Sequence, residues 1–181
     1  MTIQTIIDGV IGREGKYSDN PSDPGGATMW GITERVARAH GWAGTMQNLP
    51  RAFAEAVYTK DYVTGPGFDR IAAVSPAIAE ELVDTGVNMG SGVPGKWLQR
   101  MLNVLNQRGT AWPDLTVDGA IGPATVAALR ALLALRGADG EKVVLRALNC
   151  LQGARYIEIA EGRTASEDFI YGWLLNRVEV R

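Results

Sequence analysis

Apolar residues recur at intervals of three and four along most of this sequence, and this spacing restricts the chain to a mainly helical fold. The first stripe consists of Ile3, Ile6, Ile7, Val10 and Ile11. On a helix with 3.6 residues per turn such residues share one face, which is the face that packs against a core. Glycines at positions 12 and 15 interrupt the pattern. We therefore expect the first helix to end near Glu14.

Residues that start helices mark the rest of the chain. Helices commonly begin with Pro in the first turn or with Ser or Thr just before it. Such residues precede several of the apolar stripes in this sequence. Helices are predicted to begin near positions 33, 50, 75, 94, 123, 141 and 166, the last ending near 178. Residues 16–33 are instead rich in Gly, Pro, Asp, Asn and Ser, which favour turns. The sequence predicts one compact, mainly α domain over residues 1–181, with at most a small β element near residues 16–33.

The balance of charge argues against a polyanionic partner. The chain has 18 basic and 20 acidic residues and a net charge of -2, so nucleic acid is not an expected ligand. No apolar stretch approaches the roughly 20 residues that cross a bilayer, so stable membrane insertion is not expected either. The first residues show no basic leader and no cleavage site, which predicts a protein made in the cytoplasm without a signal peptide.

Histidine and cysteine are too scarce for the common zinc and thiol hydrolase chemistries. His40 and Cys150 each stand alone, so the usual zinc ligands are missing, and we expect neither a metal nor another cofactor. His40 precedes Gly41, which is typical of the C-terminal end of a helix. Cys150 lies in an apolar run with Leu148 and Leu151, where we expect a small buried side chain.

Three carboxylates, Glu14, Asp19 and Asp23, gather within ten residues of the turn-rich segment REGKYSDNPSDPGGATMWGIT. Turn formation accounts for some of them, because Asp and Asn before Pro or Gly bond their own backbone. A calcium loop counted from Asp19 would need an oxygen ligand and a glycine where Pro21 and Pro24 stand, so that pattern fails.

The remaining interpretation is acid catalysis of glycoside cleavage. This reaction needs one protonated carboxyl beside the leaving oxygen and a second group that activates water or forms a covalent intermediate. The C-terminal end of a helix carries partial negative charge and partial burial disfavours ionisation, so both effects favour a protonated Glu14. Glu14 is therefore the candidate general acid.

Three stretches resemble a known family. EGKYSDNPSDPGGATMWGIT resembles the hallmark of glycoside hydrolase family 108, peptidoglycan muramidases in which the Glu of an EGGY-type motif is essential, and Glu14 matches that Glu. Its spacing is also similar to the Glu, Asp, Thr set of phage-type lysozymes, since Asp23 follows after nine residues and Thr28 after five more. DGAIGPATVAALRAL is similar to the peptidoglycan-binding segment that accompanies the family, and FIYGWLLNRV looks like its closing helix. Lys16 departs from the motif, which usually has a second Gly there, and leaves the pH optimum open.

The resemblance implies a lysozyme-like fold with a catalytic part over residues 1–90 and a helical, peptidoglycan-binding-like part over residues 91–181. It implies that Glu14 is the general acid and that Asp23, with Thr28, holds a water for an inverting attack. Either Asp19 or Asp23 could position that water, and Asp23 could instead cap the following Pro-Gly turn.

Further residues are expected to contact the sugar chain. These substrate-binding candidates are Asp19, Tyr58, Tyr62 and Asn88. Aromatic rings suit the apolar faces of sugars, but packing in the core explains the two tyrosines equally well. Gly25, Gly26 and Gly31 are expected to allow backbone angles and a close sugar approach that a side chain would block.

The function implied by the resemblance is that of an N-acetylmuramidase, or lysozyme, which hydrolyses the β-1,4 bond between N-acetylmuramic acid and N-acetylglucosamine. The partner would be bacterial peptidoglycan and the protein a monomer. It resembles a phage or prophage endolysin that waits in the host cytoplasm until a holin opens the membrane. The alternatives are a non-catalytic peptidoglycan-binding or secretion-activator protein and a lytic transglycosylase.

Overall fold

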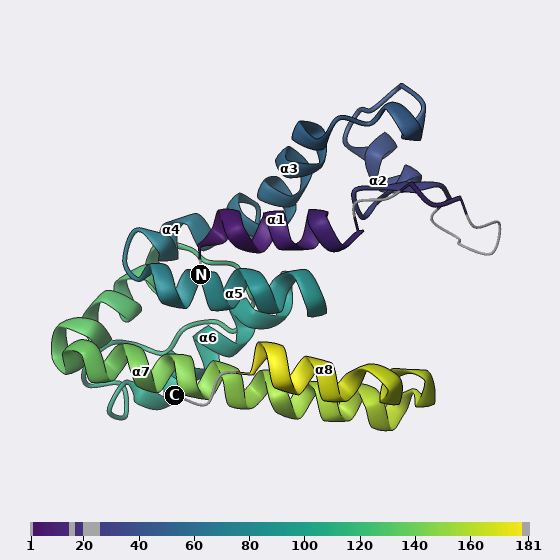
Figure 1. The fold of residues 1–181 in the computed structure, drawn as a ribbon. Helices are drawn as coiled ribbons and strands as arrows, with labels where there is room; N and C mark the ends of the chain where they lie inside the picture. The colour runs from purple at the N-terminus through teal and green to yellow at the C-terminus, as the bar shows by residue number, and fades with distance from the viewer. Residues whose placement is uncertain (1, 15–16, 20–25, 179–181) are drawn as a thin grey trace. The chain divides into compact units, whose positions relative to one another are not determined.

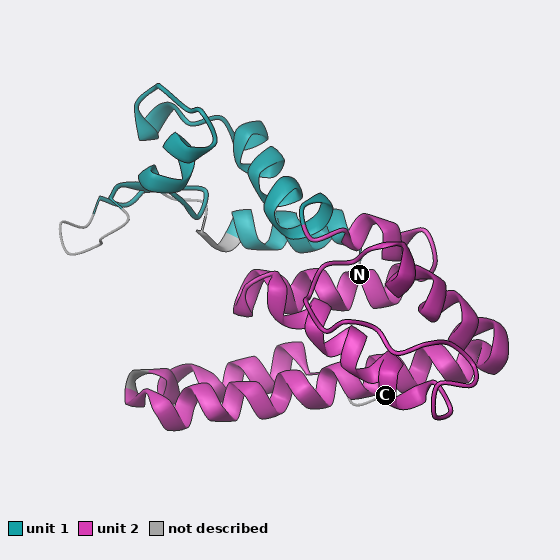
Figure 2. Cartoon of the chain, turned by 180° about the vertical axis from the view of Figure 1, so that it is seen from behind, with its two compact units in different colours: residues 1–65 teal, residues 66–181 magenta. Residues whose placement is uncertain are grey.

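The computed structural model describes residues 2–14, 17–19 and 26–178, with the side chains of residues 13, 14 and 165 outside the described part. Helices make up most of the fold, and a two-stranded antiparallel sheet accompanies them (Figure 1). The predictions of a mainly α fold and of a small β element near residues 16–33 are confirmed. The chain forms two compact units, residues 1–65 and residues 66–181 (Figure 2).

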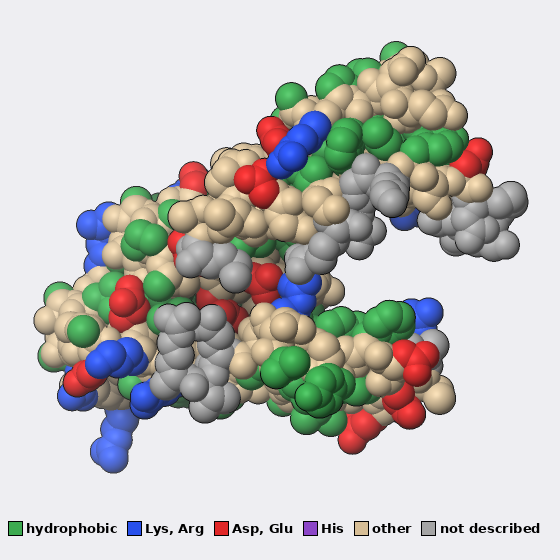
Figure 3. All heavy atoms as spheres, viewed as in Figure 1, with side chains coloured by type: hydrophobic (Ala, Val, Ile, Leu, Met, Phe, Trp, Pro, Cys, Tyr) green, Lys and Arg blue, Asp and Glu red, His purple; other side chains and the backbone are tan. Residues whose placement is uncertain are grey.

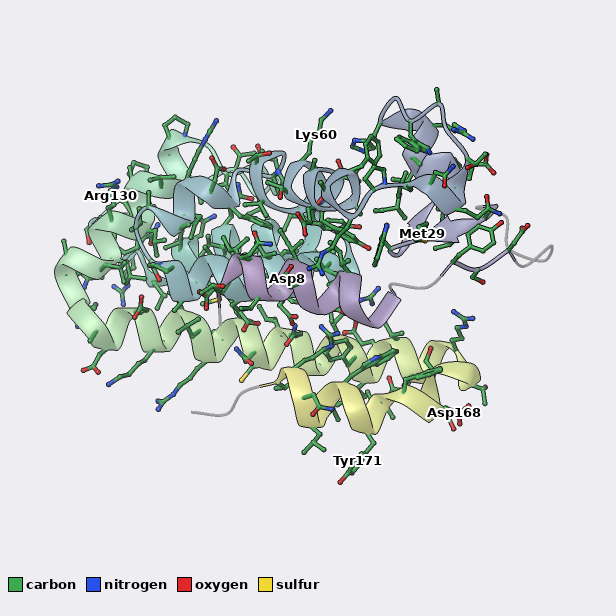
Figure 4. The ribbon with its side chains drawn as sticks, turned by 45° about the horizontal axis from the view of Figure 1, so that its top comes forward. Asp8, Met29, Lys60, Arg130, Asp168 and Tyr171 are labelled. Atoms are coloured by element: carbon green, nitrogen blue, oxygen red, sulfur yellow. The ribbon has the colours of Figure 1, made fainter. Side chains whose placement is uncertain are left out.

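Unit 1 is organised around α1 (Ile3–Glu14) and α3 (Arg51–Thr59), which pack against each other. The predicted stripe on α1 is buried from Ile6 to Ile11, with Ile11 fully inaccessible to solvent, and Ala54 and Val57 are buried on α3. At the start of α3, Arg51 forms an ion pair with Asp8, which is labelled on α1 in Figure 4. The stripe therefore forms the first helix and anchors it, as its spacing predicts.

Short elements fill the rest of unit 1. They are β1 (Thr28–Met29), β2 (Ile32–Thr33), α2 (Glu34–Ala39), the 3-10 turn η1 (Met46–Asn48) and, directly after α3, the π-helical turn η2 (Lys60–Thr64). The helix predicted to start at Pro50 thus continues past Tyr62, but its end is widened by the π turn. Such turns are rare and often occur at functional sites.

Unit 2 is an assembly of helices. They are α4 (Phe68–Ala72), α5 (Pro76–Met89), α6 (Gly92–Leu105), α7 (Pro123–Gly162), the 3-10 turn η3 (Thr164–Ser166) and α8 (Glu167–Arg177). Ser75 caps α5, since its hydroxyl accepts a hydrogen bond from the Ile78 amide at 3.1 Å. Leu98 and Leu102 of α6 are fully buried, so the apolar repeat after Pro94 serves packing, as predicted. No helix of the described ranges is long and apolar enough to span a membrane.

Helix α7 contains the two helices predicted to begin near positions 123 and 141. Gly137 lies just before the second predicted start and has non-helical angles, φ 55° and ψ -140°. The prediction of a buried Cys150 is wrong, because its side chain is exposed. Leu148 faces the core at 1% exposure, and a residue two positions further along a helix is rotated by about 200° to the opposite side.

The loop between α6 and α7 is attached to α6 by side-chain amides. Asn103 donates to the Leu115 carbonyl at 2.8 Å and accepts from the Leu115 amide at 2.7 Å. Gln99 accepts from the Gly119 amide at 2.7 Å. The loop therefore approaches α6 so closely that a β-carbon built on Gly95 would lie 2.3 Å from the Gly119 carbonyl oxygen.

The close contact predicts that alanine substitution lowers stability at one glycine of α6 and has no such effect at another. Gly95→Ala would force the α6 and loop backbones apart and should lower the free energy of unfolding by about 2–3 kcal/mol. Gly92→Ala is the matched control, because a β-carbon there meets no atom within 4 Å. Urea unfolding of both variants measures the difference. Equal stability of the two variants would contradict the close packing described here.

Candidate active site

Helix α1 ends at Glu14, as the sequence predicts. Its last turns are held by Val10 and Ile11, which are 7% and 0% exposed. A buried stripe this close to the end fixes the direction of the helix, so the backbone of Glu14 starts from a rigid support. The side chain of Glu14 and all of Asp23 lie outside the described residues, and their roles stay predictions.

The segment that carries the acidic residues is closed by backbone pairing. Ser18 and Thr28 exchange two hydrogen bonds, of 2.9 and 2.7 Å, and Thr28 also pairs with Thr33 across the β1–β2 hairpin. Ser18 and Thr28, the described residues on either side of this segment, therefore lie side by side. Thr28, the predicted water-holding residue, lies at this closing point, and its hydroxyl lies 3.5 Å from the Gly26 carbonyl oxygen.

Asp19 lies exposed next to the closing pair. It accepts a hydrogen bond of 3.3 Å from the Tyr17 hydroxyl. The pKa of Tyr17 is raised by desolvation first, and then by the nearby charge and hydrogen bond of Asp19, with a smaller contribution from Glu34. The acidic groups near the loop thus include Glu34, the first residue of α2.

The hairpin turn has an unusual backbone. Trp30 and Gly31 both have positive φ, at 56° and 74°, as the tight two-residue turn between antiparallel strands requires. Gly26 also has positive φ, at 77°, so the backbone role predicted for Gly26 and Gly31 is confirmed, while Gly25 lies outside the described residues. A tryptophan rarely adopts such angles, and its side chain must be held to keep them.

Two hydrogen bonds hold Trp30 in place. Its indole nitrogen donates to the Leu49 carbonyl at 2.8 Å, and its own carbonyl accepts from the Tyr58 hydroxyl at 3.4 Å. The hairpin is thereby tied to α3. The sequence analysis missed Trp30, although Trp-Gly between Met29 and Ile32 could have indicated a two-residue hairpin turn.

The two predicted tyrosines of the substrate site differ in exposure. Tyr58 is 5% exposed and belongs to the core of unit 1. Tyr62, on the π turn, is half-buried and its ring stacks on Tyr58 with centroids 5.8 Å apart. The pKa of Tyr62 is raised by burial and, to a lesser degree, by Asp61. Of the two rings, that of Tyr62 is the more exposed and is therefore the better placed to contact a ligand.

The remaining predicted residues lie elsewhere. Asn88 belongs to α5 of unit 2, is exposed, and donates to the Asp84 carbonyl at 2.7 Å, whereas the other candidates belong to unit 1. His40 ends α2, as predicted, and its Nε2 lies 3.0 Å from an Asp61 carboxylate oxygen. Among the residues that the structure describes, no group of three His, Cys, Asp or Glu side chains could hold a metal ion.

Comparisons with known proteins give two family matches and a similar fold. Residues 7–90 match the family model described as glycosyl hydrolase 108, and residues 93–178 match the predicted peptidoglycan domain. The chain is also similar to the solved structure of Brucella abortus SagA, with 22% sequence identity and a TM-score of 0.57, over 98% of this chain and 95% of that one. At this identity the likeness shows the fold alone. No curated protein matches the sequence.

The Trp30 anchor predicts the effect of removing one hydrogen-bond donor. Trp30→Phe should lower the free energy of unfolding by about 1 kcal/mol, because it leaves the carbonyl of the buried Leu49 unpaired. Trp42→Phe is the control, since that indole makes a longer bond of 3.2 Å to the Thr45 carbonyl on the surface. Urea denaturation compares the two. A loss in Trp30→Phe no larger than in the control would argue against the anchoring role.

Proposed function

We propose that this chain is a peptidoglycan hydrolase, and more specifically an N-acetylmuramidase with Glu14 as its general acid, because residues 7–90 match the glycosyl hydrolase 108 family model. The bond cleaved is the β-1,4 linkage between N-acetylmuramic acid and N-acetylglucosamine. The predicted peptidoglycan domain over residues 93–178 supports the same polymer as the substrate. The family match covers the whole acidic segment, which includes Glu14, Asp19 and Asp23.

One observation carries the proposal. A helix with a buried stripe ends at Glu14, and only a few residues later Ser18 and Thr28 close the segment that contains Asp23. A general acid accelerates cleavage only when it is held beside the leaving oxygen, so a rigid starting point matters as much as the carboxyl itself.

The second catalytic group in the proposal is Asp23, with Thr28 helping to hold the attacking water. This pairing makes the enzyme inverting, in which case the two carboxyls stand roughly 6.5–9.5 Å apart with room for the water between them. Thr28 supports the idea because β1 fixes its backbone at the closing point of the loop. Asp19, exposed on the same segment, is the alternative to Asp23.

The proposal extends to substrate contacts and biological role. Asp19, Tyr62 and Asn88 are proposed to contact the glycan, and Tyr58 to support Tyr62 through their stacked rings. The biological role proposed is that of a monomeric endolysin that meets the wall after a holin opens the membrane. This role rests on the resemblance to phage-type enzymes.

Removal of the proposed acid predicts a specific loss of activity. Glu14→Gln should slow the release of reducing sugar from purified sacculi at least about 10²-fold, because the leaving oxygen is no longer protonated. Its circular dichroism spectrum and melting temperature should not change. Glu161→Gln is the matched control, since Glu161 is exposed on α7. Full activity of Glu14→Gln would refute the assignment.

The role of Thr28 is tested by keeping its shape while removing its hydroxyl. Thr28→Val should preserve the hairpin, since valine favours strands, and should lower kcat about tenfold by loss of one hydrogen bond to the water. Thr28→Ser retains the hydroxyl and should keep most of the activity. If Thr28→Val is as active as the wild type at equal melting temperature, the hydroxyl does not serve catalysis.

A further inference from the structure

The π turn at the end of α3 is contacted by a side chain from another helix of unit 1. His40, the residue that ends α2, places its Nε2 atom 3.0 Å from a carboxylate oxygen of Asp61. Because a carboxylate only accepts hydrogen bonds, Nε2 carries a proton and donates it to Asp61. The side chain of His40 is 16% exposed and that of Asp61 is 38% exposed. The contact is therefore partly shielded from water.

The π turn itself closes in a way that only glycine allows. The Gly65 amide donates to the carbonyl of Lys60, five residues earlier, at 2.8 Å. A β-carbon built on Gly65 would lie 2.5 Å from that carbonyl oxygen. Turns of this kind are rare and occur mostly as single turns within or at the end of α-helices. Glycine at position 65 permits the turn, and the hydrogen bond from His40 fixes it from outside.

Tyr62 follows Asp61 directly, so whatever fixes Asp61 also fixes the backbone from which the Tyr62 ring starts. The ring is half-buried and stacks on Tyr58, with centroids 5.8 Å apart. Tyr58 in turn donates its hydroxyl to the Trp30 carbonyl at 3.4 Å. Hydrophobic side chains reach the surface of unit 1 between α2 and α3 (Figure 3). Tyr62 is thus held through its ring by Tyr58 and through its backbone by the contact of Asp61 with His40.

We propose that His40 is a positioning residue for glycan binding, which acts through Asp61 to fix the π turn so that Tyr62 presents its ring to the apolar face of an N-acetylhexosamine. A ring that is ordered before binding loses less conformational entropy when the ligand arrives. The inference rests on the proposed function, which supplies the glycan and makes Tyr62 its contact. The hydrogen bond between His40 and Asp61 accordingly sets the affinity for the glycan and not the rate of bond cleavage.

His40→Leu tests the proposal, because it removes the donor and keeps an apolar side chain. NMR titration of the full chain with chitotetraose, four β-1,4-linked N-acetylglucosamine units, measures the affinity. The wild type should bind, and His40→Leu should weaken the binding about three- to tenfold. The ring-proton signals of Tyr62, which are shifted by the Tyr58 ring, should move towards those of an unstacked tyrosine. His40→Gln keeps an N–H donor and should restore most of the affinity.

Lys60→Ala is the matched control on the same turn. Lys60 is exposed and points away from the helices in Figure 4, so this variant should bind as the wild type does. The double variant His40→Leu/Asp61→Ala should bind no more weakly than either single variant, because the two residues act through one contact. On sacculi, His40→Leu should raise KM and leave kcat unchanged.

A contact that serves stability alone would lower the melting temperature of His40→Leu and leave the affinity of the folded protein unchanged, and this result would overturn the proposal. It is also overturned if the wild type does not bind the tetrasaccharide, if His40→Gln binds as weakly as His40→Leu, or if only kcat falls. The tetrasaccharide contains no N-acetylmuramic acid. Absence of reducing sugar released from sacculi by the wild type would therefore refute the proposed function, whereas the titration reports on His40 separately.

Discussion

Two backbone hydrogen bonds between Ser18 and Thr28 pair the residues on either side of the segment that contains Asp19 and Asp23. The pairing continues into the hairpin, where Thr28 faces Thr33, and the Thr33 hydroxyl then caps α2. At the turn, the side chain of Trp30 bonds to the Leu49 carbonyl. These contacts fix the described ends of the segment on which the predicted carboxylates Asp19 and Asp23 lie.

The helical fold could be predicted because burial repeats with the period of the helix. Ile6, Ile7, Val10 and Ile11 on α1 and Leu98 and Leu102 on α6 are all buried, and Gly137 breaks α7 just before the helix start predicted near position 141. Cys150 shows the limit of the method, since an apolar neighbourhood in sequence does not decide which side of a helix a residue occupies. The π turn has no signal in the local pattern, and the hydrogen bonds that hold Trp30 come from Leu49 and Tyr58, which are distant in the sequence.

The candidate site was predictable in position more than in detail. Glu14 ends its helix and Thr28 lies in the small sheet, as expected, whereas the stacking of Tyr62 on the buried Tyr58 required the structure. The boundary between a catalytic part and a wall-binding part near residue 90 stays a prediction; the compact units divide after Gly65.

The central claim is that a carboxyl at the end of α1 donates a proton to a glycosidic oxygen and that water completes the cleavage. Mass analysis of the fragments released from purified sacculi tests this most directly. Hydrolysis between N-acetylmuramic acid and N-acetylglucosamine predicts muropeptides that end in reducing N-acetylmuramic acid. Fragments that end in anhydro-muramic acid would identify a lytic transglycosylase, and binding without any released fragment would identify a non-catalytic wall-binding protein; either result would contradict the account.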